Sequence, residues 1–343
     1  MTAQVVTRAV LKSGVGAARY RLTGHRAPLN VTISLTNRCD TLCAYCAAPM
    51  RANAELETHE WMGVIDHVAG IGAARIGFAG GEPLLRRDLE PLLHRCVQHG
   101  LLTTLETNGH LLPARVDGLA ELHQVMISYD GPSEIHDRGR ERGAHEKAVA
   151  GVEAALAAGL TVSLVTVLGK HNIDAIDHVL AMADSWGVEA LFQVMRDDTR
   201  GARRLTAANE EIRRAVRTLL EAKRDGRPVG MSEKFLRYLL TWSDFSVPEL
   251  AVPHEDLLCM AGQVYCAIDA DGGVYPCMPR VGRAPAANVR TDGFDAAFST
   301  LRNNNCRACT STACTEYNFL YNLNAPSVLD AARALLQSPR GSP

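Results

Sequence analysis

Residues 31–46 read VTISLTNRCDTLCAYC, and this stretch decides how the rest of the chain is interpreted. Its first six residues form an apolar, β-branched run that predicts a strand. Cys39, Cys43 and Cys46 follow on the loop that leaves this strand, and α/β folds build their active sites on loops at the C-terminal ends of parallel strands. Three thiolates on one short loop can hold three irons of a 4Fe-4S cluster, which leaves the fourth iron free for another ligand.

Strands followed by helices continue downstream of this loop. The further strands are predicted near residues 75–78, 101–105, 123–128, 161–168 and 189–194. Apolar residues at helical spacing predict helices between them, for example at 145–158 and at 173–186 after an Asn172 cap. Six strand–helix repeats imply parallel strands joined by right-handed crossovers. The predicted fold class is therefore α/β, an open and partial (β/α)6 barrel.

Composition limits the partners and the location of the chain. Of its 343 residues 47% are hydrophobic, and the net charge is −2, so no excess of basic side chains is available to neutralise a phosphate backbone. The most apolar stretch, 149–168, is broken by Glu153 and Gly159 and predicts no membrane span. Residues 1–24 lack the apolar region of a signal peptide. We expect a cytoplasmic enzyme without a nucleic-acid partner.

The ten cysteines are interpreted as metal-binding or catalytic groups, because the cytosol keeps thiols reduced and disfavours disulfides. Three lie between 39 and 46, six lie between 259 and 314, and only Cys96 stands apart. For the first group zinc is an alternative, but it normally takes four protein ligands and no fourth thiol lies nearby in sequence. Three unligated core cysteines are the other alternative, which suits a loop containing Asp40 and Tyr45 poorly.

The spacing CX3CX2C after the first strand, with Tyr45 before the last cysteine, resembles the radical S-adenosylmethionine (SAM) superfamily. The resemblance implies two cofactors, namely SAM and a 4Fe-4S cluster held by Cys39, Cys43 and Cys46. It implies that the reduced cluster cleaves SAM to a 5'-deoxyadenosyl radical, which abstracts a hydrogen atom from a substrate. An electron donor such as flavodoxin or ferredoxin is then an expected partner.

The segment Gly80-Gly81-Glu82-Pro83 follows the second predicted strand, as the GGEP motif of the same superfamily does. The resemblance implies that it holds the amino group of SAM, with Glu82 supplying the matching charge. Glycines at such a position let backbone groups approach a ligand closely. Without the cysteine loop before it, this segment would be read about equally well as a turn before a helix.

Polar residues at the ends of the third and fourth predicted strands are the remaining SAM-binding candidates. The resemblance places Ser128 and Asp130 near the ribose or the carboxylate of SAM, with Thr107 and Asn108 in a similar position on the third strand. Each of them is read equally well as a residue of a turn that ends a strand. His136 is a possible active-site group, but a hydrogen-bonded loop histidine explains it better.

The second cysteine group resembles the Twitch and SPASM extensions of radical SAM enzymes, which hold auxiliary 4Fe-4S clusters. Its sequence QVYCAIDADGGVYPC, residues 263–277, predicts a β-hairpin with an Asp-Gly turn. A single auxiliary cluster, as in Twitch, fits the number of cysteines better than the two clusters of SPASM. The ligands implied by the resemblance are Cys259, Cys277, Cys306 and Cys309. Cys266 and Cys314 are departures that could substitute for one of them, and a zinc ribbon is the alternative to a cluster.

These patterns divide the chain into consecutive regions. The predicted regions are a basic N-terminal segment at 1–27, the radical SAM barrel at 28–200, a helical linker at 201–258, the auxiliary cluster domain at 259–320, and a C-terminal helix with a disordered tail at 321–343. Only 38 residues precede Cys39, and their basic side chains indicate a solvated helical face rather than a leader-binding domain. A small substrate is therefore favoured over a peptide.

The main functional hypothesis is an oxidoreductase or epimerase that acts on a sugar-like or aminocyclitol metabolite. An auxiliary cluster could accept the electron of a substrate radical during dehydrogenation. Cys266 is a candidate hydrogen donor for epimerisation, although packing inside the hairpin is the plainer interpretation. The alternatives are a peptide-modifying enzyme that forms crosslinks and a non-catalytic iron–sulfur or zinc-binding scaffold.

Overall fold

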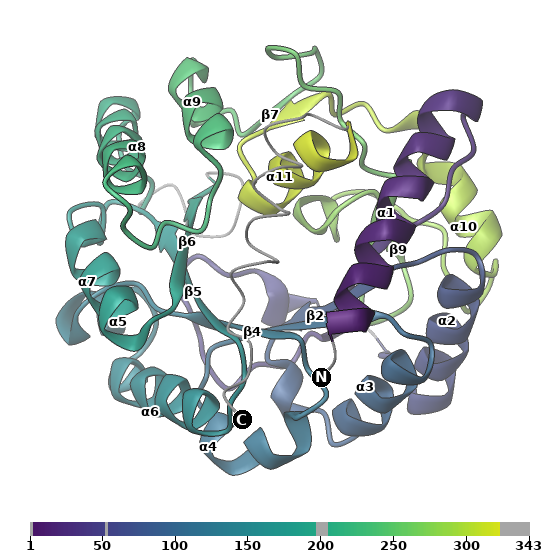
Figure 1. Ribbon diagram of the computed structural model, residues 1–343, viewed down its shortest axis with the longest axis horizontal. Coiled ribbons are helices and arrows are strands. Elements are labelled where there is room, and N and C mark those ends of the chain that lie inside the picture. The colour runs from purple at the N-terminus through teal and green to yellow at the C-terminus, as the bar shows by residue number, and fades with distance from the viewer. Residues whose placement is uncertain (1–2, 52–53, 197–204, 323–343) are drawn as a thin grey trace.

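An eight-stranded sheet organises the chain, in a computed structural model that describes residues 3–51, 54–196 and 205–322 (Figure 1). Its parallel strands are β1 Asn30–Thr36, β2 Arg75–Gly80, β3 Leu102–Thr107, β4 Gln124–Ser128, β5 Val162–Leu168 and β6 Glu189–Val194. These strands lie in the sheet in their sequence order, so each pairs with its chain neighbour. The predicted α/β partial barrel is confirmed.

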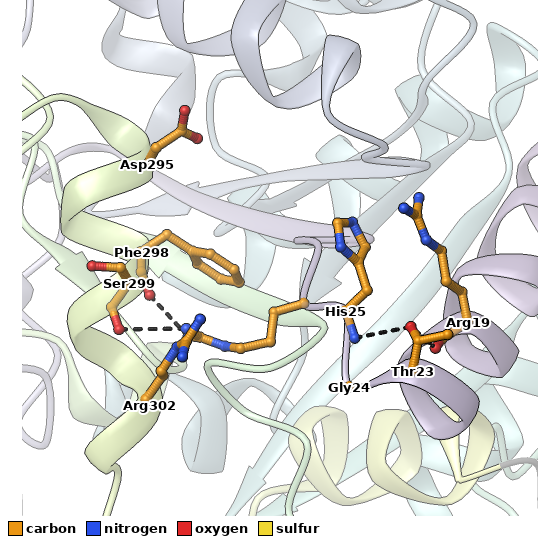
Figure 2. Close-up of a pocket in the computed structure, with 9 residues that line it drawn as sticks. Arg19, Thr23, Gly24, His25, Asp295, Phe298, Ser299 and Arg302 are labelled. Atoms are coloured by element: carbon orange, nitrogen blue, oxygen red, sulfur yellow. Dashed lines mark hydrogen bonds between the residues drawn. The ribbon is translucent and has the colours of Figure 1, made fainter.

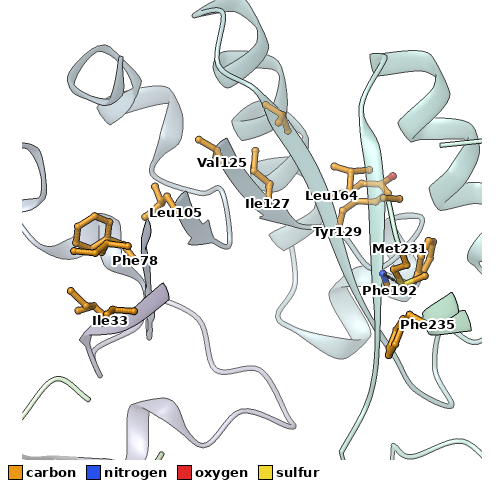
Figure 3. Close-up of a cluster of buried hydrophobic side chains, with 14 of the residues drawn as sticks. Ile33, Phe78, Leu105, Val125, Ile127, Tyr129, Leu164, Phe192, Met231 and Phe235 are labelled. Carbon is orange, nitrogen blue, oxygen red and sulfur yellow. Dashed lines mark hydrogen bonds between the residues drawn. The ribbon is translucent and has the colours of Figure 1, made fainter. Parts of the chain in front are cut away.

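Helices alternate with these strands and pack on the outer face of the sheet (Figure 1). They are α2 Thr58–Gly70, α3 Leu89–Gln98, α4 Leu112–Arg115, α5 Ser133–Gly139, α6 Ala144–Ala157, α7 Ile176–Trp186, α8 Asn209–Arg224 and α9 Glu233–Thr241, with 3-10 turns η1 Ala48–Met50, η2 Pro83–Leu85 and η3 Val116–Leu119. Figure 3 shows buried strand side chains such as Ile33, Phe78 and Leu105 in the core of this layer. Because strand side chains alternate, the residues between them face the barrel interior.

The predicted β-hairpin is present, and it joins the barrel sheet. β8 Tyr265–Ile268 and β9 Val274–Tyr275 are antiparallel, with a turn in which Gly272 has a φ of +90°. β8 also runs parallel to β1, with Asn30 opposite Tyr265. The hairpin therefore extends the barrel sheet beyond β1 instead of forming a sheet of its own.

The rest of the cysteine-rich segment reaches the other side of the barrel. Its elements are η5 Met278–Arg280, α10 Phe294–Thr300, η6 Leu301–Asn303, β10 Ala308–Cys309 and α11 Thr312–Tyr321. β10 pairs antiparallel with β7 Glu249–Leu250, which precedes this segment in the chain. The Thr312 amide donates to the Gln193 side chain at 2.8 Å, and the Thr312 hydroxyl donates to the Phe192 carbonyl at 2.8 Å. Since both acceptors lie on β6, the segment spans from β1 to β6 across the side that the six strands leave open.

The basic N-terminal segment forms helix α1, Ala3–Thr23, which packs against α11 and β3. Lys12 donates to the Ala73 carbonyl at 2.6 Å, in the turn before β2. Arg26 donates to the carbonyls of Gly262 and Phe298. A surface pocket between α1 and α10 (Figure 2) is lined by Arg19, Thr23, Gly24, His25, Arg26, Asp295, Phe298, Ser299 and Arg302. These contacts tie the N-terminal segment to the cysteine-rich segment.

Two of the expected helices differ from the structure or lie mostly outside the residues it describes. The helix expected at 173–186 begins at Ile176, because the Asn172 side chain accepts from the Gly169 amide and closes the preceding turn instead of capping the helix. Most of the C-terminal helix and tail expected at 321–343 lies outside the described residues. Among the residues described, no helix is both long and apolar enough to cross a membrane.

Candidate active site

The first three cysteines lie on one loop at the C-terminal end of β1. Cys39, Cys43 and Cys46 are all free and partly exposed, and the Cys46 amide donates to the Cys43 carbonyl at 3.1 Å. Desolvation raises the pKa of Cys39 to about 12, and it also raises the pKa values of Cys43 and Tyr45. Bound metal reverses this by deprotonating a coordinating thiol. Three partly exposed thiols on one loop therefore suit a 4Fe-4S cluster with one open iron.

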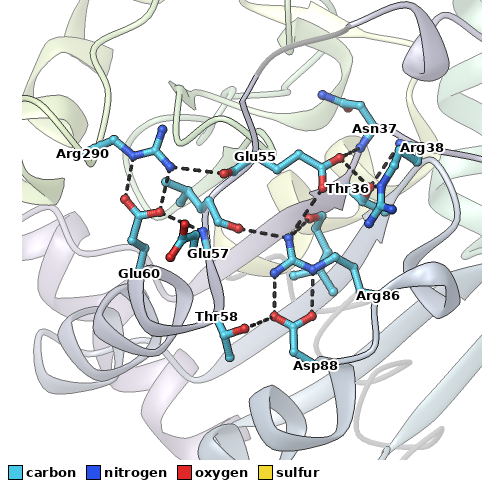
Figure 4. A network of polar contacts seen from close by, with 12 residues as sticks. Thr36, Asn37, Arg38, Glu55, Glu57, Thr58, Glu60, Arg86, Asp88 and Arg290 are labelled. Carbon is cyan, nitrogen blue, oxygen red and sulfur yellow. Dashed lines mark hydrogen bonds and ion pairs between the residues drawn. The ribbon is translucent and has the colours of Figure 1, made fainter.

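A network of charged side chains fixes the start of this loop (Figure 4). Glu55 accepts from the Thr36 hydroxyl at 2.6 Å and from the Asn37 amide at 3.0 Å. Arg86 lies 3.6 Å from Glu55 and makes a two-point contact with Asp88. Two-point contacts of this kind add geometric specificity to a charge pair. Because β1 ends at Thr36, the network sets the direction in which the cysteine loop leaves the strand.

Gly80 and Gly81 bring the GGEP segment against the base of the cysteine loop. Gly80 has a φ of +132°, and a Cβ atom at this position would collide with the Thr36 carbonyl oxygen. A Cβ atom on Gly81 would collide with the Arg38 carbonyl oxygen. The Gly81 amide donates to the Thr36 carbonyl at 2.7 Å, and the Glu82 amide donates to the Arg38 carbonyl at 2.8 Å. In this structure the close approach that needs glycine is therefore to the backbone of the loop.

Glu82 is fully buried where β2 and β3 end. Its carboxylate accepts from the Leu84 amide at 3.0 Å, the Thr107 hydroxyl at 2.9 Å and the Asn108 amide at 2.9 Å. Desolvation raises its pKa to about 7 despite these donors. A carboxylate has about four lone-pair sites, so it can accept a further hydrogen bond from a cation. The position is consistent with the expected contact to the SAM amino group.

Asn108 links the cysteine loop to GGEP. Its side-chain amide donates to the Asp40 carboxylate at 2.7 Å and lies 3.1 Å from the Thr41 hydroxyl, while its backbone amide binds Glu82. The Thr107 hydroxyl likewise donates to Glu82. Both residues thus bring together segments far apart in sequence. Asp40 and Thr41 were not assigned these roles from the sequence, because only the fold reveals Asn108 as their partner.

Asp130 is held by an ion pair and by a backbone amide. It is fully buried and accepts from Arg140 at 2.7 Å and from the Val167 amide at 3.0 Å. Burial opposes its ionisation, but the Arg140 charge lowers its pKa. Arg140 in turn lies 3.9 Å from the Cys43 sulfur, so Asp130 positions a cation beside the cysteine loop. Ser128 ends β4 on the interior face, partly exposed, and is a candidate ligand residue there.

His136 lies in helix α5 and has a hydrogen-bond partner in the strand end before it. Its Nδ1 accepts from the Asp130 amide at 3.0 Å, and the side chain is fully buried. Its ring lies 5.9 Å from those of Tyr129 and His145, and desolvation lowers its pKa to about 3. The hydrogen-bonded histidine is the interpretation that this geometry supports.

Five cysteines of the C-terminal segment gather in one apolar cluster with Tyr265 and Met260. They are Cys259, Cys277, Cys306, Cys309 and Cys314. Hydrogen bonding between the two thiols lowers the pKa of Cys259 and raises that of Cys306. Cys314 contacts the thiols of both Cys277 and Cys309. The four ligands expected from the sequence are thus brought together, and Cys314 joins them.

Cys266 is separated from this group. Its side chain is 2% exposed and packs in the main apolar core, on the strand face opposite Tyr265. Desolvation raises its pKa, as expected of an inert structural thiol. A hydrogen donor would have to reach a substrate, so this position argues against the catalytic role expected for Cys266.

Zinc was the alternative to an iron–sulfur cluster at both cysteine groups. Among the described residues, no three side chains of the His, Cys, Asp and Glu types are grouped so as to hold one metal ion. A structural zinc would require four such donors around one point. The thiolate-only donor sets are of the kind that holds iron–sulfur clusters.

Sequence comparison agrees with this geometry. A family model described as the radical SAM superfamily matches residues 33–183, from β1 to α7. A mycofactocin maturase, MftC of Mycobacterium ulcerans, is 30% identical over 289 residues, which cover 80% of this chain and 75% of that protein. The chain belongs to the radical SAM superfamily. Membership implies SAM and a 4Fe-4S cluster as cofactors of this radical SAM enzyme.

Other relatives extend the comparison. The PqqA peptide cyclase of Ruegeria pomeroyi is 29% identical over 310 residues, covering 82% of this chain and 80% of that protein. Streptococcus suis SuiB bound to its precursor peptide SuiA superposes with a TM-score of 0.66 at 16% identity, covering 90% of this chain and 76% of that one. The enzyme anSMEcpe with bound AdoMet and the Kp18Cys peptide gives 0.64 at 16% identity, covering 89% and 99%. These two structures share the fold of this radical SAM enzyme.

The relatives correct the expected substrate class. The hypothesis of an oxidoreductase or epimerase acting on a sugar-like or aminocyclitol metabolite is wrong, because the similar proteins are a PqqA peptide cyclase and mycofactocin maturases. That hypothesis depended on the 38 residues before Cys39. Their length says nothing of the barrel interior, where a substrate must approach SAM, so it was a poor guide to the substrate.

Proposed function

We propose that this radical SAM enzyme modifies a peptide, by a crosslinking or related oxidative reaction at a residue held in the barrel interior. The observation that carries the proposal is the similarity to the PqqA peptide cyclase and MftC, which covers four-fifths of this chain and therefore extends beyond the barrel into the cysteine-rich segment. The barrel fold alone would not support it, because one fold hosts many reactions.

The residues proposed to hold the cofactors lie at the C-terminal ends of the first four strands. Cys39, Cys43 and Cys46 would ligate the cluster, with Tyr45 beside them, and Glu82 would accept the SAM ammonium. When bound, the cluster and SAM supply a radical that removes a hydrogen atom from the substrate. The chain's own part is positional: Asn108 holds the loop against GGEP, and Asp130 holds Arg140 beside Cys43.

The cysteine-rich segment is proposed to hold one auxiliary 4Fe-4S cluster. Four of its thiols suffice as ligands, and Cys259, Cys277, Cys306 and Cys309 remain the proposed set, with Cys314 in contact with two of them. Such a cluster could accept the electron that a substrate radical loses when a crosslink forms. Flavodoxin or ferredoxin is the proposed source of the electron that starts the reaction. The free state of all ten cysteines suits a reducing compartment such as the cytoplasm.

The proposal is tested with reduced holoenzyme, SAM and the short peptides encoded beside its gene. We expect one peptide to lose two hydrogens for each bond formed, read by mass spectrometry, with 5'-deoxyadenosine released. The matched control is the Cys39→Ala, Cys43→Ala, Cys46→Ala triple variant with the same peptides. Release of 5'-deoxyadenosine without a mass change in any peptide, together with turnover of a small polar metabolite, would contradict the proposal.

A further inference from the structure

Two charged side chains of the barrel interior have no role in the site described above. Arg75 opens β2 and Glu106 lies near the end of β3. Ile76, Phe78 and Leu105, which alternate with them, are buried in the outer core. Side chains alternate between the two faces of a strand, so Arg75 and Glu106 point to the barrel interior. The contact of Arg75 with the Thr104 hydroxyl at 2.9 Å places Thr104 on the same face.

The side chain of Glu106 is exposed to solvent. Desolvation raises its pKa, and the charge of Arg75 opposes this. Within the described part of the chain, Glu106 has neither a hydrogen bond nor an ion pair. A carboxylate without a hydrogen-bond or ion-pair partner in the protein can pair with a cation that a ligand brings.

The guanidinium of Arg75 has protein partners, whereas the carboxylate of Glu106 has none among the described residues. The Arg75 guanidinium, at the first residue of β2, lies 5.4 Å from the centre of the Tyr317 ring of α11. Together with the bond to Thr104, this stacking holds Arg75 at the N-terminal end of the strands. Of these two side chains, Glu106 is therefore the one that is left to meet a substrate.

The location of Glu106 relates it to the SAM site. It directly precedes Thr107 and Asn108, which bind Glu82, and it pairs in register with Met126 of β4. Thr107 points to the outside of the strand and Glu106 to the inside. The Glu106 carboxylate therefore lies on the interior face of β3, next to the residues that hold Glu82.

We propose that Glu106 is a specificity-determining residue that binds a cationic side chain, a lysine or arginine, of the substrate peptide beside the residue that is modified. This inference deepens the proposed function and rests on it for the peptide nature of the substrate. Charge-assisted hydrogen bonds are about twice as strong as neutral ones, so a basic residue would be favoured over an isosteric apolar one.

The test measures binding rather than turnover. Acetylated, amidated pentapeptides with a central lysine, norleucine or glutamate between glycines are titrated into oxidised, SAM-loaded holoenzyme by calorimetry. We expect the lysine peptide to bind about tenfold more tightly than the norleucine peptide, the size of effect of a hydrogen bond to a charged group. Glu106→Gln should abolish this ratio, and Glu106→Lys should invert it in favour of the glutamate peptide.

The matched control is Glu189→Gln. Glu189 is an exposed carboxylate on the same sheet face, at the start of β6, and its removal should leave the ratio unchanged. Iron content and SAM affinity show whether the variants are intact. Equal binding of lysine and norleucine peptides by the wild type, no binding up to about 10 mM, or a preference that survives Glu106→Gln each overturns the inference. Binding is read without product, so failure of the proposed peptide modification is detected separately, by the mass assay.

Discussion

The two cysteine groups of this enzyme use thiols in opposite ways. Those on the loop after β1 are partly exposed and are held by polar contacts among Glu55, Arg86 and Asp88. Four of the five that gather in the C-terminal segment are buried, in an apolar cluster in which the thiols contact one another. A site that must admit a second ligand needs an open face, whereas a site that is complete with protein ligands can be closed. This difference agrees with the roles proposed for the two groups, SAM cleavage at the first and electron acceptance at the second.

The largest expected effect separates the two groups directly. Replacing Cys39, Cys43 and Cys46 together with Ala should abolish SAM cleavage, because the iron that would bind SAM is no longer held. The buried second group should stay loaded, so iron per chain should fall by about half. Iron analysis and 5'-deoxyadenosine release are the measurements. Continued SAM cleavage by the triple variant would remove the functional distinction between the groups.

The next largest effect is expected on the free energy of unfolding, when the buried ion pair of Asp130 and Arg140 beside the first group is broken. Asp130→Asn leaves Arg140 buried without its counter-charge, and breaking such a pair costs about 3–5 kcal/mol of unfolding free energy. Urea denaturation of the holoenzyme measures this. The control is Asp177→Asn, whose exposed pair with Arg227 should contribute about 0–1 kcal/mol. Equal losses for the two variants would show that Asp130 does not support the cysteine loop through Arg140.

A smaller effect is expected at Glu82, as a change in SAM affinity. Its pKa of about 7 means that the ionised form, which attracts the SAM ammonium, dominates at pH 8 and is the minor form at pH 6. SAM affinity of the wild type should therefore fall roughly tenfold from pH 8 to pH 6. Glu82→Gln should bind SAM weakly and without this pH dependence, with unchanged iron content. An affinity for SAM that Glu82→Gln leaves intact would make GGEP a structural turn.

The smallest effect concerns membership of the second group. Cys314→Ala should lower iron per chain, by at most about half, because its thiol contacts two of the proposed ligands. Cys266→Ala should leave iron unchanged, because that thiol packs in the main core and touches none of the five. Iron analysis of the two variants side by side decides the point. Loss of iron from Cys266→Ala alone would reverse the assignment.

Local pattern predicted the barrel well because its strands are rich in apolar and β-branched residues and lie between turn residues. The six strands were placed to within about two residues, and the hairpin turn at Gly272 was recognised from its Asp-Gly pair. The pairing of β8 with β1 was not predicted, because a parallel partner more than 200 residues away leaves no trace in local periodicity. The roles of Asn108 and Asp130 were missed for the same reason, since their partners lie on other strands and loops.

The sequence by itself determined the superfamily, the fold class and the two groups of cysteines, since these depend on spacing along a short stretch of chain. Tertiary structure alone decided which of the extra cysteines belongs to the second group and which charges face the barrel interior. Cys266 and Cys314 were both left over from the expected ligand set, yet strand alternation buries Cys266 in the core and α11 carries Cys314 to the cysteine cluster. Such choices depend on which elements pack together, and packing is a property of the whole chain.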